Sequence, residues 1–282
     1  MALNFCSFSS GSSGNSYLIF TQSTTLLVDV GVTGKTLQEG LNYCGRQLTD
    51  LDAVFLTHEH HDHVRGLPVL INSLRKCDPD SPWETRIYGS PGTLAAAQDR
   101  FKGKVDLSSG SFVDPLTTLM IGDIEITTFR LSHDAAEPTG FRFDSRGKSL
   151  AIVTDTGIVN NSILRNVWDV DFLVLESNHE KSMLLMGKYP YDLKLRILGD
   201  YGHLSNDHAA LALTEMIKIR NEENKKETLS VALAHLSNEN NTRDMASLTL
   251  NNILFENDYI QGKDYSLRIL DRDMVGEIIT LD

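Results

Sequence analysis

The feature that most constrains this chain is a run of metal-binding side chains directly after a short apolar segment. Ala53–Thr57 (Ala-Val-Phe-Leu-Thr) predicts a buried strand, and His-Glu-His-His-Asp-His follows it. A loop that leaves a strand can turn alternate side chains to one side, so His58 and His60 can face one ion, while Asp62 and His63 face a second. Imidazole and carboxylate groups suit Zn, Mn, Fe or Co. A chance cluster is improbable with nine histidines in 282 residues, so we infer a metal site.

Around this run, strands and helices are mixed along the whole chain. Strands are predicted at Leu3–Phe8, Tyr17–Phe20, Thr25–Asp29, Ala53–Thr57, Arg86–Tyr88, Thr117–Ile121, Ile124–Leu131, Gly140–Asp144, Ser149–Thr154, Asp171–Glu176, Leu229–Ala234, and a final pair Tyr265–Leu270 and Val275–Ile279. Helices are predicted at Thr33–Cys44, Pro91–Phe101, Asn161–Val167, Asn206–Arg220 and Asn241–Phe255. The many short adjacent strands indicate an α+β fold with two mixed sheets packed together and helices outside, in one domain over residues 1–282.

Composition and charge exclude several classes of protein. No stretch approaches the roughly 20 apolar residues of a membrane span, and the first residues lack the features of a signal peptide. The three cysteines are far apart, which predicts reduced thiols and a cytoplasmic location: Cys6, Cys44 and Cys77. The net charge of −12 argues against nucleic-acid binding through a global positive field. Two divalent cations, with their +4 charge, would bring it to −8 and concentrate positive charge in one pocket.

The pattern His58-x-His60-x-Asp62-His63 resembles the signature of the metallo-β-lactamase superfamily. The resemblance implies an αββα sandwich with two divalent metal ions (Zn, Mn or Fe) at one edge of the paired sheets. It also implies three further ligands at strand ends, and the chain offers one at each expected place. These are a third ligand for the first metal, a bridging carboxylate and a last ligand for the second metal: His133, Asp155 and His235. The residues between the first ligands are expected to point away: Glu59 and His61.

The expected chemistry follows from that resemblance. Two ions about 3.5–4 Å apart can hold a bridging hydroxide, polarise the scissile group and stabilise the leaving oxygen. No side-chain nucleophile is then required. Superfamily members that cleave phosphodiesters usually have the bridging carboxylate at Asp155, whereas two-zinc β-lactamases usually lack it. The resemblance therefore favours phosphodiester hydrolysis, with no organic cofactor.

A second element, Gly202-His203-Leu204-Ser205, is similar to one in ribonuclease Z and phosphoribosyl cyclic phosphodiesterase. There the histidine is not a ligand but contacts the phosphate and helps to protonate the leaving group, a role that we carry over to His203. The alternative is a histidine at the start of a helix that Ser205 or Asn206 caps. We expect catalysis to involve His203 together with Asp62.

Further segments narrow the resemblance to the YycJ (WalJ) group of bacterial proteins. They are Ser10–Ser16 (Ser-Gly-Ser-Ser-Gly-Asn-Ser), Glu176–His179 (Glu-Ser-Asn-His), Arg196–Asn206 and Ala234–Asn241. That group is associated with exonuclease action on DNA from 5′ ends, so the expected partner is a phosphodiester substrate, DNA or a nucleotide. Substrate contacts are predicted, beside His203, at Ser13, Asn15, Asn178, His179 and Asn241.

Other functions stay open at this point. Within hydrolases they are the cleavage of a small cyclic phosphate, a thioester or a β-lactam, and outside them a non-catalytic metal-binding regulatory protein. Phe141 and Phe143 alternate on a strand and are expected in the core rather than as a base-stacking platform. A nuclease of this charge needs a local basic rim, for which the candidates are Arg142, Arg146, Lys148, Lys181, Lys188, Lys194 and Arg196.

Overall fold

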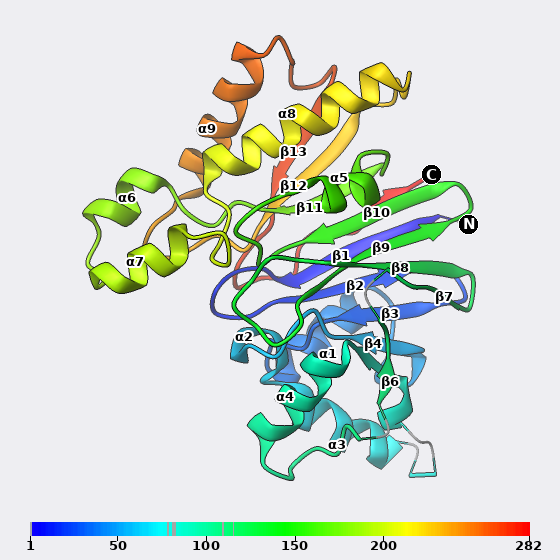
Figure 1. Ribbon diagram of the computed structural model, residues 1–282. Coiled ribbons are helices and arrows are strands. Elements are labelled where there is room, and N and C mark those ends of the chain that lie inside the picture. Colours follow the sequence, from blue (N-terminus) through cyan, green and yellow to red (C-terminus); the bar gives the residue numbers. More distant parts are fainter. Residues whose placement is uncertain (1, 78, 81–82, 109, 115) are drawn as a thin grey trace.

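The computed structural model describes residues 2–77, 79–80, 83–108, 110–114 and 116–282. Within these residues, two mixed sheets of seven strands each pack face to face, and helices cover both outer faces (Figure 1). The strand orders are β14-β1-β2-β3-β4-β5-β6 and β13-β12-β11-β10-β9-β8-β7. The predicted fold class, an αββα sandwich, is confirmed.

The elements have the following bounds. The first sheet contains β1 (Leu3–Ser9), β2 (Ser16–Phe20), β3 (Thr25–Val28), β4 (Ala53–Phe55), β5 (Ile87–Gly89), β6 (Ser111–Phe112) and β14 (Ile279–Leu281). The second contains β7 (Thr118–Ile121), β8 (Ile124–Arg130), β9 (Thr139–Ser145), β10 (Lys148–Val153), β11 (Phe172–Glu176), β12 (Leu229–Ala234) and β13 (Tyr265–Ile269). The helices are α1 (Gly34–Tyr43), α2 (His61–Val64), α3 (Leu67–Cys77), α4 (Pro91–Phe101), α5 (Asn161–Val167), α6 (Lys181–Met186), α7 (Tyr191–Leu198), α8 (Asn206–Glu222) and α9 (Arg243–Glu256), with 3₁₀ turns at Leu48–Asp50 and Trp83–Arg86.

The apolar strands are buried on both faces, as expected of a sheet that lies between another sheet and a layer of helices. Along β3, Leu26 and Val28 face the core between the sheets, whereas Leu27 faces the helices. Aromatic rings fill the layer between the sheets, where the centroids of Phe55 and Phe141 lie 5.3 Å apart. The predicted core positions Phe141 and Phe143 are both fully buried, so the prediction that they belong to the core is confirmed.

The topology brings several strand ends to one edge of the sandwich. In the second sheet, β10, β11 and β12 are parallel, and β8 runs in the same direction because it is antiparallel to β9, which is antiparallel to β10. In the first sheet, β3 and β4 are parallel. Residues that directly follow these strands therefore gather at one edge, which is where polar side chains for a site can converge.

Three expectations about the fold need correction. The last two strands do not pair with each other: β13 adds to β12, and Ile279 of β14 pairs with Phe5 of β1 in the other sheet. The segment between them therefore crosses the edge of the sandwich instead of making a hairpin. The charge run Arg220–Glu227 predicts an exposed helix end, but Arg220 itself is buried and donates hydrogen bonds to the carbonyls of Trp168 and Val170. Helices α3, α6 and α7 were not expected.

Among the described residues, no helix combines the length and apolar character that crossing a membrane requires.

Candidate metal centre

Four predicted ligands lie in the short loop and helical turn that follow β4. His58 is buried at the end of the strand, and helix α2 begins three residues later and carries Asp62 and His63. The residues between them do point elsewhere: Glu59 accepts a hydrogen bond from the backbone N–H of Ala136 at 2.9 Å, and His61 is exposed. The alternation expected from the sequence therefore separates inward donors from outward ones.

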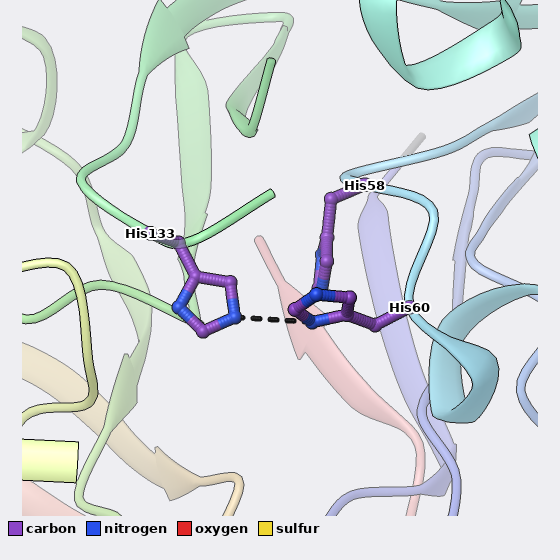
Figure 2. A group of neighbouring side chains, drawn as sticks. All are labelled: His58, His60 and His133. Atoms are coloured by element: carbon purple, nitrogen blue, oxygen red, sulfur yellow. Dashed lines mark hydrogen bonds between the residues drawn. The ribbon is translucent and has the colours of Figure 1, made fainter. Parts of the chain in front are cut away.

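His133, which follows β8, joins His58 and His60 in a first group of donors. One ligand atom from each residue lies within 4.8 Å of the others, and Figure 2 shows the three imidazoles turned toward one another. Nε2 of His133 lies 3.2 Å from Nδ1 of His60, and the opposite nitrogen, Nδ1, lies 2.9 Å from the carbonyl oxygen of Gly202. That carbonyl fixes the orientation of the ring, as the outer hydrogen bond of a metal-ligating histidine usually does.

A second group consists of Asp62, His63 and His235, the last of which follows β12. Oδ2 of Asp62 lies 3.4 Å from Nε2 of His235 and 3.5 Å from Nε2 of His63. The three residues come from both sheets, so the sandwich itself assembles the group.

Asp155, at the end of β10, lies between the two groups. It belongs to a cluster with His58 and His63, and its Oδ2 is 3.2 Å from Nε2 of His63. Its Oδ1 lies 3.8 Å from Nε2 of His133 and 3.5 Å from Nδ1 of His235. The carboxylate thus lies beside imidazoles of both groups, with Oδ1 near His133 and His235 and Oδ2 near His63, which is the position that a shared ligand requires.

The donor set fits metal ions. Nε2 of His58 and Oδ2 of Asp155 are buried and have no hydrogen-bond partner within the described residues, although buried polar groups are nearly always paired. Burial alone would raise the pKa of Asp155, but the nearby His235 and His63 hold it well below its usual range. The cluster therefore presents an ionised carboxylate among imidazoles, a combination that borderline divalent cations prefer.

Backbone conformation at the strand ends helps to aim these groups. Asp155 has φ of 60° and His235 has φ of 55°, and the supporting residue Asp29 has φ of 58°. The left-handed region is uncommon for residues other than glycine, though Asp, Asn and His enter it several-fold more often than most. A single left-handed residue after each strand turns the chain sharply, so that the side chain stays at the edge of the sheet.

Two buried carboxylates support the ligands and were not predicted from the sequence. Asp29, which follows β3, accepts hydrogen bonds from the backbone N–H and Oγ1 of Thr57, and its Oδ2 lies 2.7 Å from Nδ1 of His63. Glu176, at the end of β11, lies with Oε1 2.7 Å from Nδ1 of His203 and 2.9 Å from Nδ1 of His235. Each is an acidic residue at the end of an apolar strand, and that was the one signal in the sequence that could have identified them.

Charge interactions between these carboxylates and imidazoles shift the pKa values of both kinds of group. Burial would raise the pKa of Glu176, but His203 and His235 lower it to about 2. Burial likewise would lower the pKa of His235, but Asp155, Asp62 and Glu176 raise it to about 10. Without metal, His235 therefore carries a proton at neutral pH, and a cation has to displace that proton in order to bind there.

His203 lies beside the ligands without belonging to the first group. It follows α7 in the loop before α8, and its ring centroid is 4.9 Å from that of His133 and 5.2 Å from that of His235. Its side chain is 21% exposed, and it lines a cavity of about 200 Å³. With Nδ1 engaged by Glu176, its Nε2 is the nitrogen left for a molecule in that cavity. The helix start is capped independently, by Ser205, which accepts from the N–H of His208.

The predicted substrate contacts divide into two kinds. Asn178 lines the same cavity as His203, and Ser13 is exposed in the turn between β1 and β2. Asn15 is buried, and its amide nitrogen lies 3.0 Å from Nε2 of His63. Asn241 is also buried, and its amide donates to the carbonyls of Ser177 and Asn178. The amide of Asn15 thus lies on the ligand side of His63, whereas the amide of Asn241 holds the backbone beside the centre.

His179 is buried, and both ring nitrogens lack a hydrogen-bond partner in the described part of the chain. Burial lowers its pKa to about 4, so the ring is neutral at physiological pH. The residue is near the centre but does not belong to any of its ligand groups.

The basic residues proposed as a rim do not form one surface. Arg142, on β9, is paired with Asp144 and Asp169, and it contacts the end of α5 instead of the centre. Arg196, on α7, lines the cavity beside His203 and forms an ion pair with Asp134. Of these two residues, only Arg196 can contact a substrate at the centre.

Close backbone packing sets the position of the ligand-bearing turn. Gly31 donates to the carbonyl of Asn15 at 2.8 Å, and Asn15 donates to the carbonyl of Asp62 at 2.8 Å. A Cβ at Gly31 would lie 1.6 Å from the carbonyl oxygen of Asp62 and 2.6 Å from the nitrogen of Asn15. Only glycine fits here, and the reason is space rather than φ.

Comparisons with known proteins agree with this architecture. The chain is 33% identical over 278 residues to the exodeoxyribonuclease YycJ of Bacillus anthracis, with 99% of each chain covered. It is 38% identical over 259 residues to the exodeoxyribonuclease WalJ of Streptococcus pneumoniae, which covers 92% of this chain and 90% of that one. Among solved structures, the metallo-β-lactamase fold protein YhfI of Bacillus subtilis superposes with a TM-score of 0.69 at 17% identity, over 99% of both chains.

The model of the β-lactamase superfamily domain matches residues 24–221, which include all of the predicted ligands except His235. That last residue, after β12, lies with the others at the same edge of the sandwich. On this match, and on the similarity to relatives over nearly its whole length, the chain belongs to the metallo-β-lactamase superfamily.

Proposed function

We propose that this chain is a dinuclear metal-dependent phosphodiesterase that acts as an exonuclease on the 5′ ends of DNA. The observation that carries the proposal is the position of His203 beside the ligand cluster, held by Glu176 at 2.7 Å and facing an open cavity. The names of the relatives that align over almost the whole chain, both exodeoxyribonucleases, support the choice of DNA.

The residues divide into two ligand sets with one shared member. His58, His60 and His133 would hold the first ion, and Asp62, His63 and His235 the second. The carboxylate of Asp155 would contact both ions. When bound, two divalent cations supply Lewis acidity toward a phosphoryl oxygen and lower the pKa of water for attack.

His203 supplies the proton for the leaving oxygen. Nδ1 of His203 lies 2.7 Å from Oε1 of Glu176, so Nε2 is the nitrogen that faces the cavity and can pass a proton to the leaving oxygen. The same carboxylate lies 2.9 Å from Nδ1 of His235, so one buried group orients both the proton donor and a ligand. A positioned imidazolium contributes about 10²–10⁴-fold in such reactions.

The net charge of −12 is compatible with this proposal if the enzyme recognises an end of DNA and not an extended duplex. Contacts would then be confined to the centre, where the cations concentrate positive charge, and to a few neighbouring groups such as Arg196. A weak dependence of cleavage on salt is expected, since few phosphates are neutralised away from the centre.

The test is hydrolysis of bis-p-nitrophenyl phosphate and of 5′-phosphorylated duplex DNA with added Mn²⁺ or Zn²⁺. Wild type is compared with Asp155→Ala and His203→Ala, and His208→Ala serves as a control because His208 is an exposed histidine on α8. We expect both site variants to lose at least about 100-fold in activity, but only Asp155→Ala to lose bound metal.

A metal-loaded wild type that leaves both phosphodiesters intact but opens a thioester or a β-lactam would show that the substrate class is wrong. A metal-loaded protein inert toward all of these substrates would favour a regulatory role. Loss of metal from His203→Ala would make that residue a ligand instead of a proton donor.

A further inference from the structure

The cavity beside His203 is small. Its volume of about 200 Å³ lies below the roughly 300–1,000 Å³ of sites for drug-sized ligands. It therefore has room for one compact group and not for an extended chain. Because His203 is in its lining, a group that enters the cavity lies next to the proposed proton donor.

The walls of this cavity combine an ion pair, between Arg196 and Asp134, with apolar and neutral polar groups. Apolar and aromatic surface comes from Tyr189, just before α7, and from Leu193 and Ile197, which lie four residues apart on one face of that helix. Polar atoms come from three loops at the edge of the sandwich, through Ser12, Asn178 and Ser237. A planar heterocycle matches this lining, because it has apolar faces and hydrogen-bonding edges.

Helix α7 has no evident role in the core that would explain its apolar face. None of its residues is fully buried, and Figure 1 shows α6 and α7 projecting from the side of the sandwich. Lys194 ties the pair together through hydrogen bonds to the carbonyls of Leu185 and Gly187, both 2.7 Å long. The segment after α7 is anchored to the centre, since Gly202 contacts the ring of His133 through its carbonyl.

We propose that this cavity binds the nucleobase of the terminal nucleotide that the enzyme releases, and thereby limits cleavage to one nucleotide at a time. The inference rests on the proposed function. In the hydrolysis, a water oxygen bonds to phosphorus and loses one proton to solvent, the P–O3′ bond breaks with its electron pair on O3′, and O3′ takes a proton from His203, which solvent then protonates again. The leaving nucleotide, with its base, therefore lies on the His203 side, where the cavity is.

The experiment compares two 5′-phosphorylated single-stranded oligothymidylates in the presence of Mn²⁺. One has thymine on its first nucleotide, and the other has an abasic tetrahydrofuran residue there. Wild type should remove the first nucleotide from the thymine substrate with a kcat/KM about tenfold higher, which corresponds to about 1.4 kcal/mol. Leu193→Ala should reduce that ratio to below about threefold.

Leu195→Ala is the matched control, because Leu195 lies on the same helix, is 50% exposed and does not line the cavity. It should retain the tenfold ratio, and thermal melts of both variants should coincide with that of wild type. Tyr189→Ala tests the second apolar group, with the same expected loss of the ratio.

Equal rates of wild type on the two substrates would overturn the inference while leaving the proposed function intact. The inference also fails if Leu193→Ala slows both substrates by the same factor, or if Leu195→Ala removes the ratio equally well. If metal-loaded wild type cleaves neither oligonucleotide, the proposed function fails, and this inference fails with it.

Discussion

Replacing Gly31 with alanine should disable the centre through a steric effect on the backbone of Asp62, a residue that carries a proposed ligand. The added Cβ would lie 1.6 Å from the carbonyl oxygen of Asp62, about 1.8 Å short of the 3.4 Å at which ordinary contact begins. Gly31 does not have a positive φ, so alanine is allowed there by its own backbone. The whole effect therefore comes from pushing the turn that carries Asp62 and His63.

The size of the displacement decides the expected outcome. Functional groups have to stay within about 0.5 Å of their productive positions, and a misplacement of about 1 Å can cost on the order of 100-fold in rate. We expect Gly31→Ala to lower kcat/KM by at least about 100-fold and to lose metal on dialysis. Overpacking of this kind costs about 1–3 kcal/mol in stability, so the folded protein should survive at low temperature.

The assay is metal content after dialysis, combined with phosphodiester hydrolysis and thermal melting. Gly34→Ala is the control: its Cβ would meet a methyl group of Val69 at 2.9 Å, and that side chain is 51% exposed and can turn aside. The control should retain metal and activity. If Gly31→Ala bound metal as tightly as wild type and kept its activity within about threefold, the argument from backbone contact would be wrong.

Three further predictions concern the groups behind the ligands. Asp29→Asn should weaken metal binding by about 10- to 100-fold, because the amide is a poorer acceptor for His63; chelator competition measures this, and unchanged affinity would argue against an orienting role. Metal binding at pH 7 to 8 should release protons, because the pKa of His235 is raised to about 10 and a ligand imidazole has to be neutral. The apparent metal affinity should therefore rise with pH. Calorimetry in buffers of different ionisation enthalpy should detect the proton release, and heats that do not depend on the buffer would contradict the prediction. The metal-free protein should lose about 3 kcal/mol of stability as the pH falls from 4.5 to below 2, because folding lowers the pKa of Glu176 to about 2. The stabilisation from the ionised Glu176 is present above pH 4.5 and is lost when the carboxylate is protonated. Urea melts should show that the stability of Glu176→Gln depends less on acid pH than that of wild type, and an identical pH dependence would count against the coupling to His203.

Much of the fold and of the ligand cluster could be predicted, because the pattern of apolar strands and of polar residues after them is visible in the sequence. The apolar strand Ala53–Phe55 and the polar run after it are adjacent in the sequence, so their relation needs no knowledge of the rest of the chain. His133, Asp155 and His235 were expected at strand ends from the resemblance, and the structure brings them into the same clusters. That they bind metal remains a prediction.

What could not be predicted depends on contacts between distant segments. Asp29 and Glu176 are single acidic residues after strands, and a carboxylate in that position is ordinarily a turn residue; only the fold places Glu176 between His203 and His235. The last strand has the same difficulty, because the pattern in Val275–Ile279 fits a hairpin with β13 as well as it fits the distant edge at β1. Helix α7 is amphipathic, but its apolar residues line a cavity instead of packing in the core. Its pattern in the sequence therefore does not show what its apolar side faces.

The division of the ligands between the sheets has a consequence for how such a centre can be built. His58, His60, Asp62 and His63 follow a strand of the first sheet, whereas His133, Asp155 and His235 follow strands of the second. Each sheet by itself offers only part of the two proposed ligand sets, so both sheets have to be in place before either set is complete. Metal affinity then measures how well the two sheets are assembled. Damage to the junction between the sheets, even far from the ligands, would appear first as loss of metal.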